Sequence, residues 1–240
     1  LLIKSLKNKN FYTYGQKNGS NLRIINIRQN KLYSQFDINI NFSNEKNQII
    51  KNIKIPLLGI HNIRNAVGSI GVALSLGIPV KNIKRGLKNF KGVERRFNKV
   101  FTYNNVDVYD DYAHHPTEIK VVLEGIKKVF STHEKICIFQ PHRISRLKDL
   151  KKEFSLAFKD ADTVILCPIY TAGEKIKLGF SYESFAKLLI KNSRVKLVMI
   201  ENKFELAKYL KNSMYGKKLI VGMGAGSISS WIRDLPKLIK

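Results

Sequence analysis

Short apolar runs alternate with longer amphipathic segments from residue 97 to the C-terminus, and this alternation restricts the fold strongly. Strands are predicted at 97–103, 106–110, 135–140, 163–168, 195–200 and 217–222, and helices at 117–130, 147–160, 181–191, 202–212 and 227–239. Repeated strand–helix units build a parallel sheet with helices on both faces. The first two strands form a hairpin around Asn104 and Asn105, so one of the six strands runs antiparallel. We therefore predict an α/β domain with a mostly parallel six-stranded sheet.

The first part of the chain has a different pattern. Residues 1–58 contain four runs typical of short strands, namely Phe11–Tyr14, Leu22–Ile27, Phe36–Phe42 and Ile49–Ile55. These runs predict a small antiparallel sheet. Two helices, Ala66–Leu76 and Val80–Phe90, are expected to follow it. Because the pattern changes within Gly92–Phe97, we predict two domains, 1–93 and 94–240.

The net charge of +25 fits either a nucleic-acid partner or a lysine-rich composition spread over the surface. We favour the second reading and expect no nucleic-acid partner, because the lysines are scattered and no arginine-rich tract occurs. We also expect no membrane partner, because no apolar run is long enough to span a bilayer. Cys137 and Cys167 each lie in an apolar run, so they are expected to be buried free thiols of a cytoplasmic protein.

Three polar clusters follow predicted strands of the second domain. They are Asp110–Glu118, Gln140–Arg146 and Tyr170–Glu174. In open α/β sheets, ligands bind beyond the carboxyl ends of the strands, so these clusters are expected at one edge. Pro116 is expected at the first position of the following helix.

Each cluster leaves alternatives open. Arg143 and Arg146 suit a carboxylate or a phosphate, but they also fit an exposed arginine pair. Asp110 and Asp111 suit Mg²⁺ or a ribose hydroxyl pair. The histidines 114 and 115 suit acid–base groups, caps or metal ligands. Neighbouring histidines diverge in extended chain and no third ligand has metal spacing, so we predict no metal site in this chain.

Three further segments carry candidate residues. His61, Asn62 and Asn65 open the first helix, where they fit an anion and base-edge site, or plain capping with a core histidine. Arg95 and Arg96 fit a phosphate contact or a basic linker. The run Gly222–Gly226 predicts a close backbone approach rather than a dinucleotide site, because its third glycine is misplaced.

Six motifs in this order resemble the Mur ligase family, the ATP-dependent amide-bond ligases of peptidoglycan and cell-wall synthesis. They are Gly59–Ala66, Gly92–Phe97, Asp110–Glu118, Gln140–Arg146, Tyr170–Glu174 and Gly224–Ile228. The resemblance runs from about Tyr12 to the C-terminus. It implies that residues 1–93 are part of the family's central ATP-binding domain. It also implies that residues 94–240 are its Rossmann-like C-terminal domain.

Within the family, the motifs are most similar to those of the members that join L-alanine to UDP-N-acetylmuramate through an acyl phosphate. That similarity implies that ATP contacts His61, Asn62, Asn65, Arg96 and either Asp110 or Asp111. It implies that L-alanine contacts Tyr112, His114, Arg143 and Arg146, with His114, Arg143 and Arg146 as the catalytic set. Two arginines can bind the alanine carboxylate and leave its amine free to attack.

The chain departs from the family in lacking a Gly-x-x-Gly-Lys-Ser/Thr phosphate loop. The UDP-binding domain and the expected Mg²⁺ ligands are also missing from the resemblance. Without the loop lysine and the metal, the γ-phosphate charge is not neutralised. We therefore expect a C-terminal portion that is inactive alone and whose partner is the missing N-terminal half.

Two alternative functions remain open. The first is the Mur ligase branch that recycles a whole peptide onto UDP-N-acetylmuramate, although that branch typically has Pro-Arg-Ser where this chain has Gln140–Arg143. The second is a non-catalytic nucleotide- or RNA-binding module. RNA binding would weaken steeply as the salt concentration rises, which separates the second alternative from a ligase.

Overall fold

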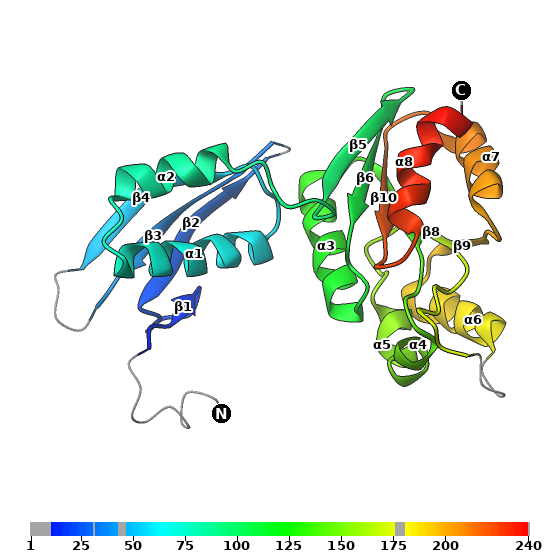
Figure 1. Cartoon of the computed structure of the whole chain (residues 1–240), viewed down its shortest axis with the longest axis horizontal. Helices are drawn as coiled ribbons and strands as arrows, with labels where there is room; N and C mark the ends of the chain where they lie inside the picture. Colours follow the sequence, from blue (N-terminus) through cyan, green and yellow to red (C-terminus); the bar gives the residue numbers. More distant parts are fainter. Residues whose placement is uncertain (1–10, 31, 43–46, 176–180, 240) are drawn as a thin grey trace. The chain divides into compact units, whose positions relative to one another are not determined.

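The structure is a computed structural model that describes residues 11–30, 32–42, 47–175 and 181–239. The chain divides into two compact units on either side of the Lys91–Gly92 bond (Figure 1). We call them unit 1 and unit 2 and describe each by itself. The domain boundary predicted from sequence, 93/94, lies two residues beyond this division.

Unit 1 contains a four-stranded sheet in the order β1-β2-β3-β4. Its strands are β1 (Tyr14–Gly15), β2 (Leu22–Gln29), β3 (Ser34–Ile40) and β4 (Gln48–Ile55). The predicted antiparallel pairing is confirmed for β2 with β3 and for β3 with β4. It is wrong for β1, which is only two residues long and runs parallel to β2. The backbone N–H of Thr13, just before β1, donates to Asn21 Oδ1, just before β2, at 2.9 Å. This bond joins the starts of the two strands, as their parallel pairing requires.

Two helices, α1 (Ile60–Ser75) and α2 (Val80–Asn89), complete unit 1. Ile63, Val67 and Ile70 of α1 are buried against the apolar side chains of β2, β3 and β4. The predicted start of α1 at residue 66 is wrong, because the helix begins six residues earlier. Gly59 has a φ of 91°, which turns the extended chain into the helix at that point.

Unit 2 contains a six-stranded sheet in the order β5-β6-β10-β7-β8-β9. Its elements are β5 (Asn98–Tyr103), β6 (Val106–Asp111), α3 (Pro116–Val129), β7 (Glu134–Phe139), α4 (Ile144–Asp149), α5 (Lys151–Leu156), β8 (Thr163–Leu166), α6 (Tyr182–Ser193), β9 (Lys196–Met199), α7 (Lys203–Ser213), β10 (Lys218–Met223) and α8 (Ile228–Leu238). Only β5 pairs antiparallel, with β6, and every other pairing in this sheet is parallel. The α/β fold with a mostly parallel sheet is therefore confirmed.

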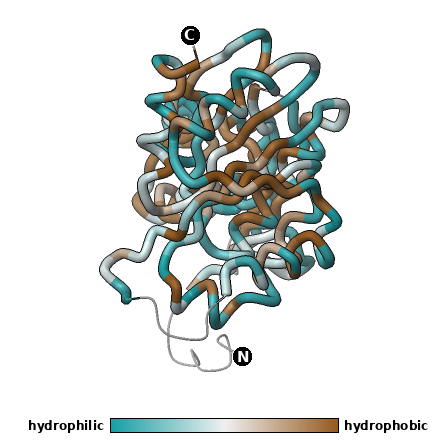
Figure 2. The backbone as a smooth tube through the Cα atoms, turned by 90° about the vertical axis from the view of Figure 1, so that its right-hand side faces the viewer, coloured by the Kyte–Doolittle hydropathy of each residue, from teal (hydrophilic) through white to brown (hydrophobic). Residues whose placement is uncertain are grey.

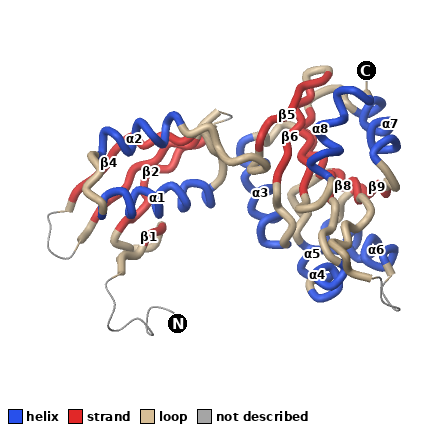
Figure 3. Tube along the Cα trace, viewed as in Figure 1, coloured by secondary structure: helices blue, strands red, loops and turns tan. Residues whose placement is uncertain are grey.

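Helices cover both faces of this sheet (Figure 3). Ile136 and Ile138 of β7 join the core formed with α7 and α8. Phe139 points to the opposite face, where its ring lies against those of Phe154 and Phe158. Successive side chains of a strand alternate between faces, and the apolar run of a parallel strand serves both. Figure 2 shows hydrophobic segments in the interior of the part that faces the viewer and mostly hydrophilic segments around them.

One helix of unit 2 differs from its prediction. The single helix expected at 147–160 is two short helices, α4 and α5, separated at Leu150 with φ −110° and ψ 26°. Cys137 and Cys167 are buried free thiols, as predicted. Within the described part of the chain, no helix is long and apolar enough to cross a lipid bilayer.

Candidate functional site

Four loops meet at the carboxyl edge of the sheet in unit 2. They follow β6, β10, β7 and β8, which are successive neighbours in that sheet. The backbone N–H of Gly224 donates to the Asp111 carbonyl at 3.3 Å, and that of Arg143 donates to the Tyr170 carbonyl at 2.8 Å. His142 also forms an isolated parallel bridge with Tyr170. The three polar clusters predicted at strand ends therefore lie together on one edge, beside the glycine-rich loop.

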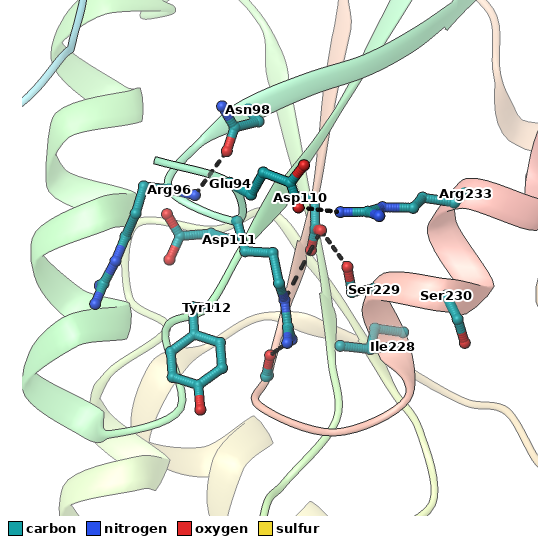
Figure 4. Close-up of polar contacts among 12 residues, drawn as sticks. Glu94, Arg96, Asn98, Asp110, Asp111, Tyr112, Ile228, Ser229, Ser230 and Arg233 are labelled. Carbon is teal, nitrogen blue, oxygen red and sulfur yellow. Dashed lines mark hydrogen bonds and ion pairs between the residues drawn. The ribbon is translucent and has the colours of Figure 1, made fainter. Parts of the chain in front are cut away.

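Asp110 is held inside this edge, and its side chain is only 2% exposed. The hydroxyl of Ser229, on α8, donates to Asp110 Oδ2, and Arg95 Nε lies 4.0 Å from the same oxygen (Figure 4). Oδ1 is buried and has no hydrogen-bond partner among the described residues. The Asp110 carboxylate therefore presents no exposed oxygen to a ligand in this geometry.

Asp111 is also buried, and both of its oxygens are used by the backbone. Oδ1 accepts the N–H of Ala113 at 2.7 Å, and Oδ2 accepts the N–H of Phe97 at 2.8 Å. Burial raises the pKa of Asp111 to about 6, although these hydrogen bonds act in the opposite direction. Asp111 therefore fixes the turn after β6 and ties it to the segment before β5.

The ring of Tyr112 lies among cationic and aromatic side chains. The guanidinium of Arg95 lies 4.6 Å from the ring centroid, and that of Arg96 lies 5.8 Å from it. The ring of His114 meets it edge-on at 4.9 Å. Arg95 is partly buried, whereas Arg96 is exposed. Figure 4 shows Arg96 and Tyr112 on the same side of this turn.

The two histidines of the turn have separate roles. His115 is the N-cap of α3, which begins at Pro116 as predicted, and its Nδ1 accepts the N–H of Thr117 at 3.3 Å. His114 Nδ1 lies 2.9 Å from the Tyr112 carbonyl. A carbonyl can only accept, so in this arrangement Nδ1 carries the proton. Of the predicted alternatives, capping therefore applies to His115.

His142 links His114 to the two predicted arginines. Its ring stacks on Tyr170 at 5.5 Å and lies 5.9 Å from the His114 ring. Arg146 Nη1 lies 3.3 Å from His142 Nδ1. Because arginine can only donate, His142 accepts through Nδ1 and is neutral in this contact. Partial burial and then the charge of Arg146 lower the pKa of His142.

Arg143 is exposed at the start of α4, where its φ is 71°. The Glu174 carboxylate lies nearby and accepts both the hydroxyl of Ser145 at 2.6 Å and its backbone N–H at 3.0 Å. These two bonds lower the pKa of Glu174, and Arg143 adds to the effect. The Tyr170–Glu174 cluster is thus tied to the start of α4, and the Arg143 guanidinium remains available at the surface.

The glycine-rich loop approaches its neighbours closely, as predicted. A Cβ on Gly226 would lie 2.5 Å from the Tyr170 ring and 2.6 Å from Gln140 Oε1, and one on Gly224 would lie 2.7 Å from the Gln140 carbonyl. Gln140 is buried, and its Oε1 accepts the N–H of Ile228 at 3.0 Å. The side chain of Gln140 therefore holds the start of α8 in place.

The three candidate residues of unit 1 lie in the first turns of α1. Asn62 is buried, and its Nδ2 donates to the Leu58 carbonyl at 2.8 Å, so it ties down the preceding loop rather than capping the helix. Asn65 is exposed and His61 is half-buried. His61 lies over Gly59, whose added Cβ would meet the imidazole at 2.6 Å. The structure thus groups these residues on one helix end.

Sequence reasoning missed the roles of Arg95, Gln140 and Ser229. Arg95 Nη2 donates to the Gly224 carbonyl at 2.6 Å across 129 residues of sequence, and Ser229 lies 119 residues from Asp110. Only the glycines of the last loop gave a signal, because they predicted a close approach. No group of three or more His, Cys, Asp or Glu side chains is placed to hold a metal ion in the part of the chain that the structure describes.

Comparisons with known proteins show similarity to one family. The family model "Mur ligase, glutamate ligase domain" matches residues 95–226, which is more than half of the chain. The chain is 63% identical over 238 residues to the UDP-N-acetylmuramate–L-alanine ligase of Pelagibacter ubique (strain HTCC1062), covering 99% of this chain and 51% of that protein. It thus spans about half the length of the curated relatives it matches.

Solved structures share the fold. The UDP-N-acetylmuramate–alanine ligase of Thermotoga maritima superposes with a TM-score of 0.75 at 26% identity, covering 94% of this chain and 47% of that one. A murein peptide ligase of Psychrobacter arcticus 273-4 superposes with a TM-score of 0.66 at 22% identity, covering 99% of this chain and 49% of that one. The match of the family model over more than half of the chain shows that the chain belongs to the Mur ligase family.

Proposed function

We propose that this chain serves in the ATP-dependent ligation of L-alanine to UDP-N-acetylmuramate, a step of peptidoglycan synthesis in the cytoplasm. The observation that carries the proposal is the meeting of Tyr112, His114, His142 and Arg146 at one sheet edge, with Arg143 exposed beside them. The 63% identity to a ligase named for these two substrates supports the same reaction. The peptide-recycling alternative has weaker support, because its similar structure is 22% identical and indicates the fold alone.

The amino acid is received by its carboxylate. Arg143 and Arg146 carry planar guanidinium groups, which bind carboxylates with two parallel hydrogen bonds. Arg146 is braced by His142, and Arg143 is exposed at the head of α4. His114 and Tyr112 lie edge to face beside this pair, and we assign both to contacts with the rest of the amino acid. The amine stays free to attack the activated carboxyl group.

The reaction needs positioning and charge neutralisation more than a covalent enzyme intermediate. ATP transfers its γ-phosphate to the carboxylate of UDP-N-acetylmuramate, the alanine amine attacks the acyl carbon, and inorganic phosphate leaves. In unit 2, Arg96 is the exposed cation of the predicted ATP set. Asp110 and Asp111 are buried and engaged with Ser229 and the backbone, so this geometry does not fit a direct ribose contact. In unit 1, the exposed Asn65 and half-buried His61 are the accessible groups for the adenine, with Asn62 holding the loop beneath them.

Part of the machinery is expected from outside these 240 residues. The sequence contains no Gly-x-x-Gly-Lys-Ser/Thr pattern. In the described residues, no group of acidic side chains is placed to hold Mg²⁺. When bound, Mg²⁺ would help to neutralise the charge of the γ-phosphate. We therefore propose that the phosphate loop, the Mg²⁺ ligands and the UDP-binding domain come from a polypeptide that corresponds to the half of the relatives this chain does not match.

The test is to complete the ligase. The half of the Pelagibacter ubique relative that this chain does not match is supplied in trans, or fused to the chain, and phosphate release is measured. We expect release that requires ATP, UDP-N-acetylmuramate and L-alanine together, and none from the chain alone. Release that prefers a tripeptide over L-alanine would favour the recycling ligase. No release from the completed protein, together with salt-sensitive RNA binding, would favour the nucleic-acid module.

A further inference from the structure

Arg95 is the side chain that joins two loops of the candidate site. Its Nη2 donates to the Gly224 carbonyl, in the loop after β10, at 2.6 Å. The same guanidinium packs over the Tyr112 ring, in the loop after β6, with 4.6 Å to the centroid. Its backbone carbonyl accepts the N–H of Tyr112 at 2.7 Å. Arg95 thus contacts both loops with its side chain and one of them with its backbone.

Burial makes these contacts hard to replace. The Arg95 side chain is 23% exposed, and its Nε is buried 4.0 Å from Asp110 Oδ2. The Arg95 guanidinium thus forms an ion pair with the buried Asp110 carboxylate. Hydrogen bonds that involve a charged group are stronger than neutral ones, and a buried charge without a partner is costly. The conformation is also unusual, because Arg95 is a non-glycine residue with a φ of 60°.

The loop that Arg95 holds reaches the other half of the site. Gly226, two residues after Gly224, lies against the Tyr170 ring and Gln140. Tyr170 in turn stacks on His142, which contacts Arg146. A displacement of the glycine-rich loop would therefore move Tyr170, on which His142 of the His142–Arg146 pair stacks.

We propose that Arg95 is a positioning residue of the ligase, which couples the Tyr112 side of the amino-acid site to the His142–Arg146 side through the glycine-rich loop. The side chain of Arg95 contacts Gly224, Tyr112 and Asp110, which are parts of the surrounding loops and strand. It sets the distance between Tyr112 and the arginines that receive the alanine carboxylate. The assignment of Tyr112 and Arg146 to alanine rests on the proposed function, whereas the coupling between the two loops does not.

Three substitutions separate this role from a general effect on folding. Arg95→Ala removes the hydrogen bond to Gly224 and the contact with the Tyr112 ring. Arg95→Lys keeps a positive charge near Asp110 but lacks the planar fork, so it should restore only part of the coupling. Arg233→Ala is the matched control, because Arg233 is an exposed arginine of α8 whose recorded partner is the exposed Glu94 at 3.4 Å (Figure 4).

The first readout is amide hydrogen exchange at Gly224 and Tyr112, measured by NMR on this whole chain. We expect Arg95→Ala to speed exchange at both amides roughly tenfold, because it removes the charged hydrogen bond that holds the loop after β10. Arg95→Lys should give a smaller rise, and Arg233→Ala should give none. Exchange at Gly224 unchanged by Arg95→Ala would overturn the coupling.

The second readout is steady-state kinetics of the completed ligase. We expect Arg95→Ala to raise the KM for L-alanine about tenfold and the KM for ATP less than twofold. Equal rises in both KM values would overturn the assignment of Arg95 to the amino-acid site. If the completed wild-type ligase shows no alanine-dependent phosphate release, the proposed function fails, and the exchange measurement still decides whether Arg95 couples the two loops.

Discussion

Replacing Asp111 by Asn tests whether its buried carboxyl group titrates between pH 4 and 7. The carboxylate accepts the backbone N–H groups of Ala113 and Phe97 at 2.7 and 2.8 Å. An asparagine has one acceptor oxygen, so one of these buried N–H groups loses its partner. That loss costs about 1–3 kcal/mol at any pH. The informative quantity is the difference in the free energy of unfolding between wild type and variant, measured as a function of pH.

The direction of the pKa shift of Asp111 decides whether its contribution to stability rises or falls with pH. Burial raises the pKa of Asp111 from 3.8 to about 6. The folded state therefore binds the proton more tightly than the unfolded state, and the stability linked to that proton is fully present below pH 3.8. It is lost as the pH rises through 6. A shift of about two pH units corresponds to about 3 kcal/mol at 1.36 kcal/mol per unit.

The assay is urea unfolding between pH 4 and 7, followed by the fluorescence of Trp231. The chain has a single tryptophan, and Trp231 packs against the core of unit 2, so the signal reports that unit. We expect the free energy of unfolding of the wild type, relative to Asp111→Asn, to fall by roughly 2–2.5 kcal/mol between pH 4 and 7, because asparagine does not titrate and part of the full change lies below pH 4.

Glu174→Gln provides a control of opposite sign. The hydroxyl and then the backbone N–H of Ser145 lower the pKa of Glu174, so its contribution to stability is present above the unfolded value of 4.5 and is lost as the pH falls. The wild type should therefore gain stability relative to Glu174→Gln as the pH rises. A pH-independent difference for Asp111→Asn, with the expected trend for Glu174→Gln, would refute the reasoning about burial.

Two further substitutions at the site, with one control on α2, test packing and charge. Gly226→Ala should destabilise the chain by about 1–3 kcal/mol, because the added Cβ would lie 2.5 Å from the Tyr170 ring. In the control Gly86→Ala, the added Cβ meets nothing within 4 Å, so this change on α2 should stabilise the chain slightly. Calorimetry measures the stability of both variants. Arg146→Gln should move the NMR titration midpoint of His142 upward, because burial and then Arg146 lower that pKa; an unmoved midpoint would contradict the 3.3 Å contact.

The strand–helix alternation predicted most of unit 2 because each element carries its own periodicity. The parallel strands could be predicted from apolar runs such as that of β7, because a strand buried on both faces of a sheet is apolar throughout. The break between α4 and α5 could not be read, because the buried Leu147 and Phe154 on either side of it continue a helical pattern. In unit 1, the direction of β1 depends on side-chain bonds between Thr13 and Asn21, which have no periodic signature.

The candidate site was predictable as a location but not as a network. Polar residues after β6, β7 and β8 indicated the carboxyl edge, since parallel strands end there together. The burial of Asp110 depends on Ser229 and Arg95, which come from distant parts of the chain. Sequence spacing does not reveal such pairings. The ribose contact expected for Asp110 or Asp111 stays a prediction, which the burial of both carboxylates does not favour.

The central claim is that the arginines at this edge receive the carboxylate of L-alanine. The most direct test compares kcat/KM for L-alanine and L-alaninamide, which lacks the carboxylate, in the completed ligase and in its Arg143→Ala variant. We predict that the wild type prefers L-alanine about 10–100-fold and that the variant loses most of this preference, because a charged hydrogen bond contributes about 1.5–3 kcal/mol. The exposed Arg85 on α2 provides the control variant, Arg85→Ala, which should keep the preference. An equal preference in wild type and Arg143→Ala would contradict the account.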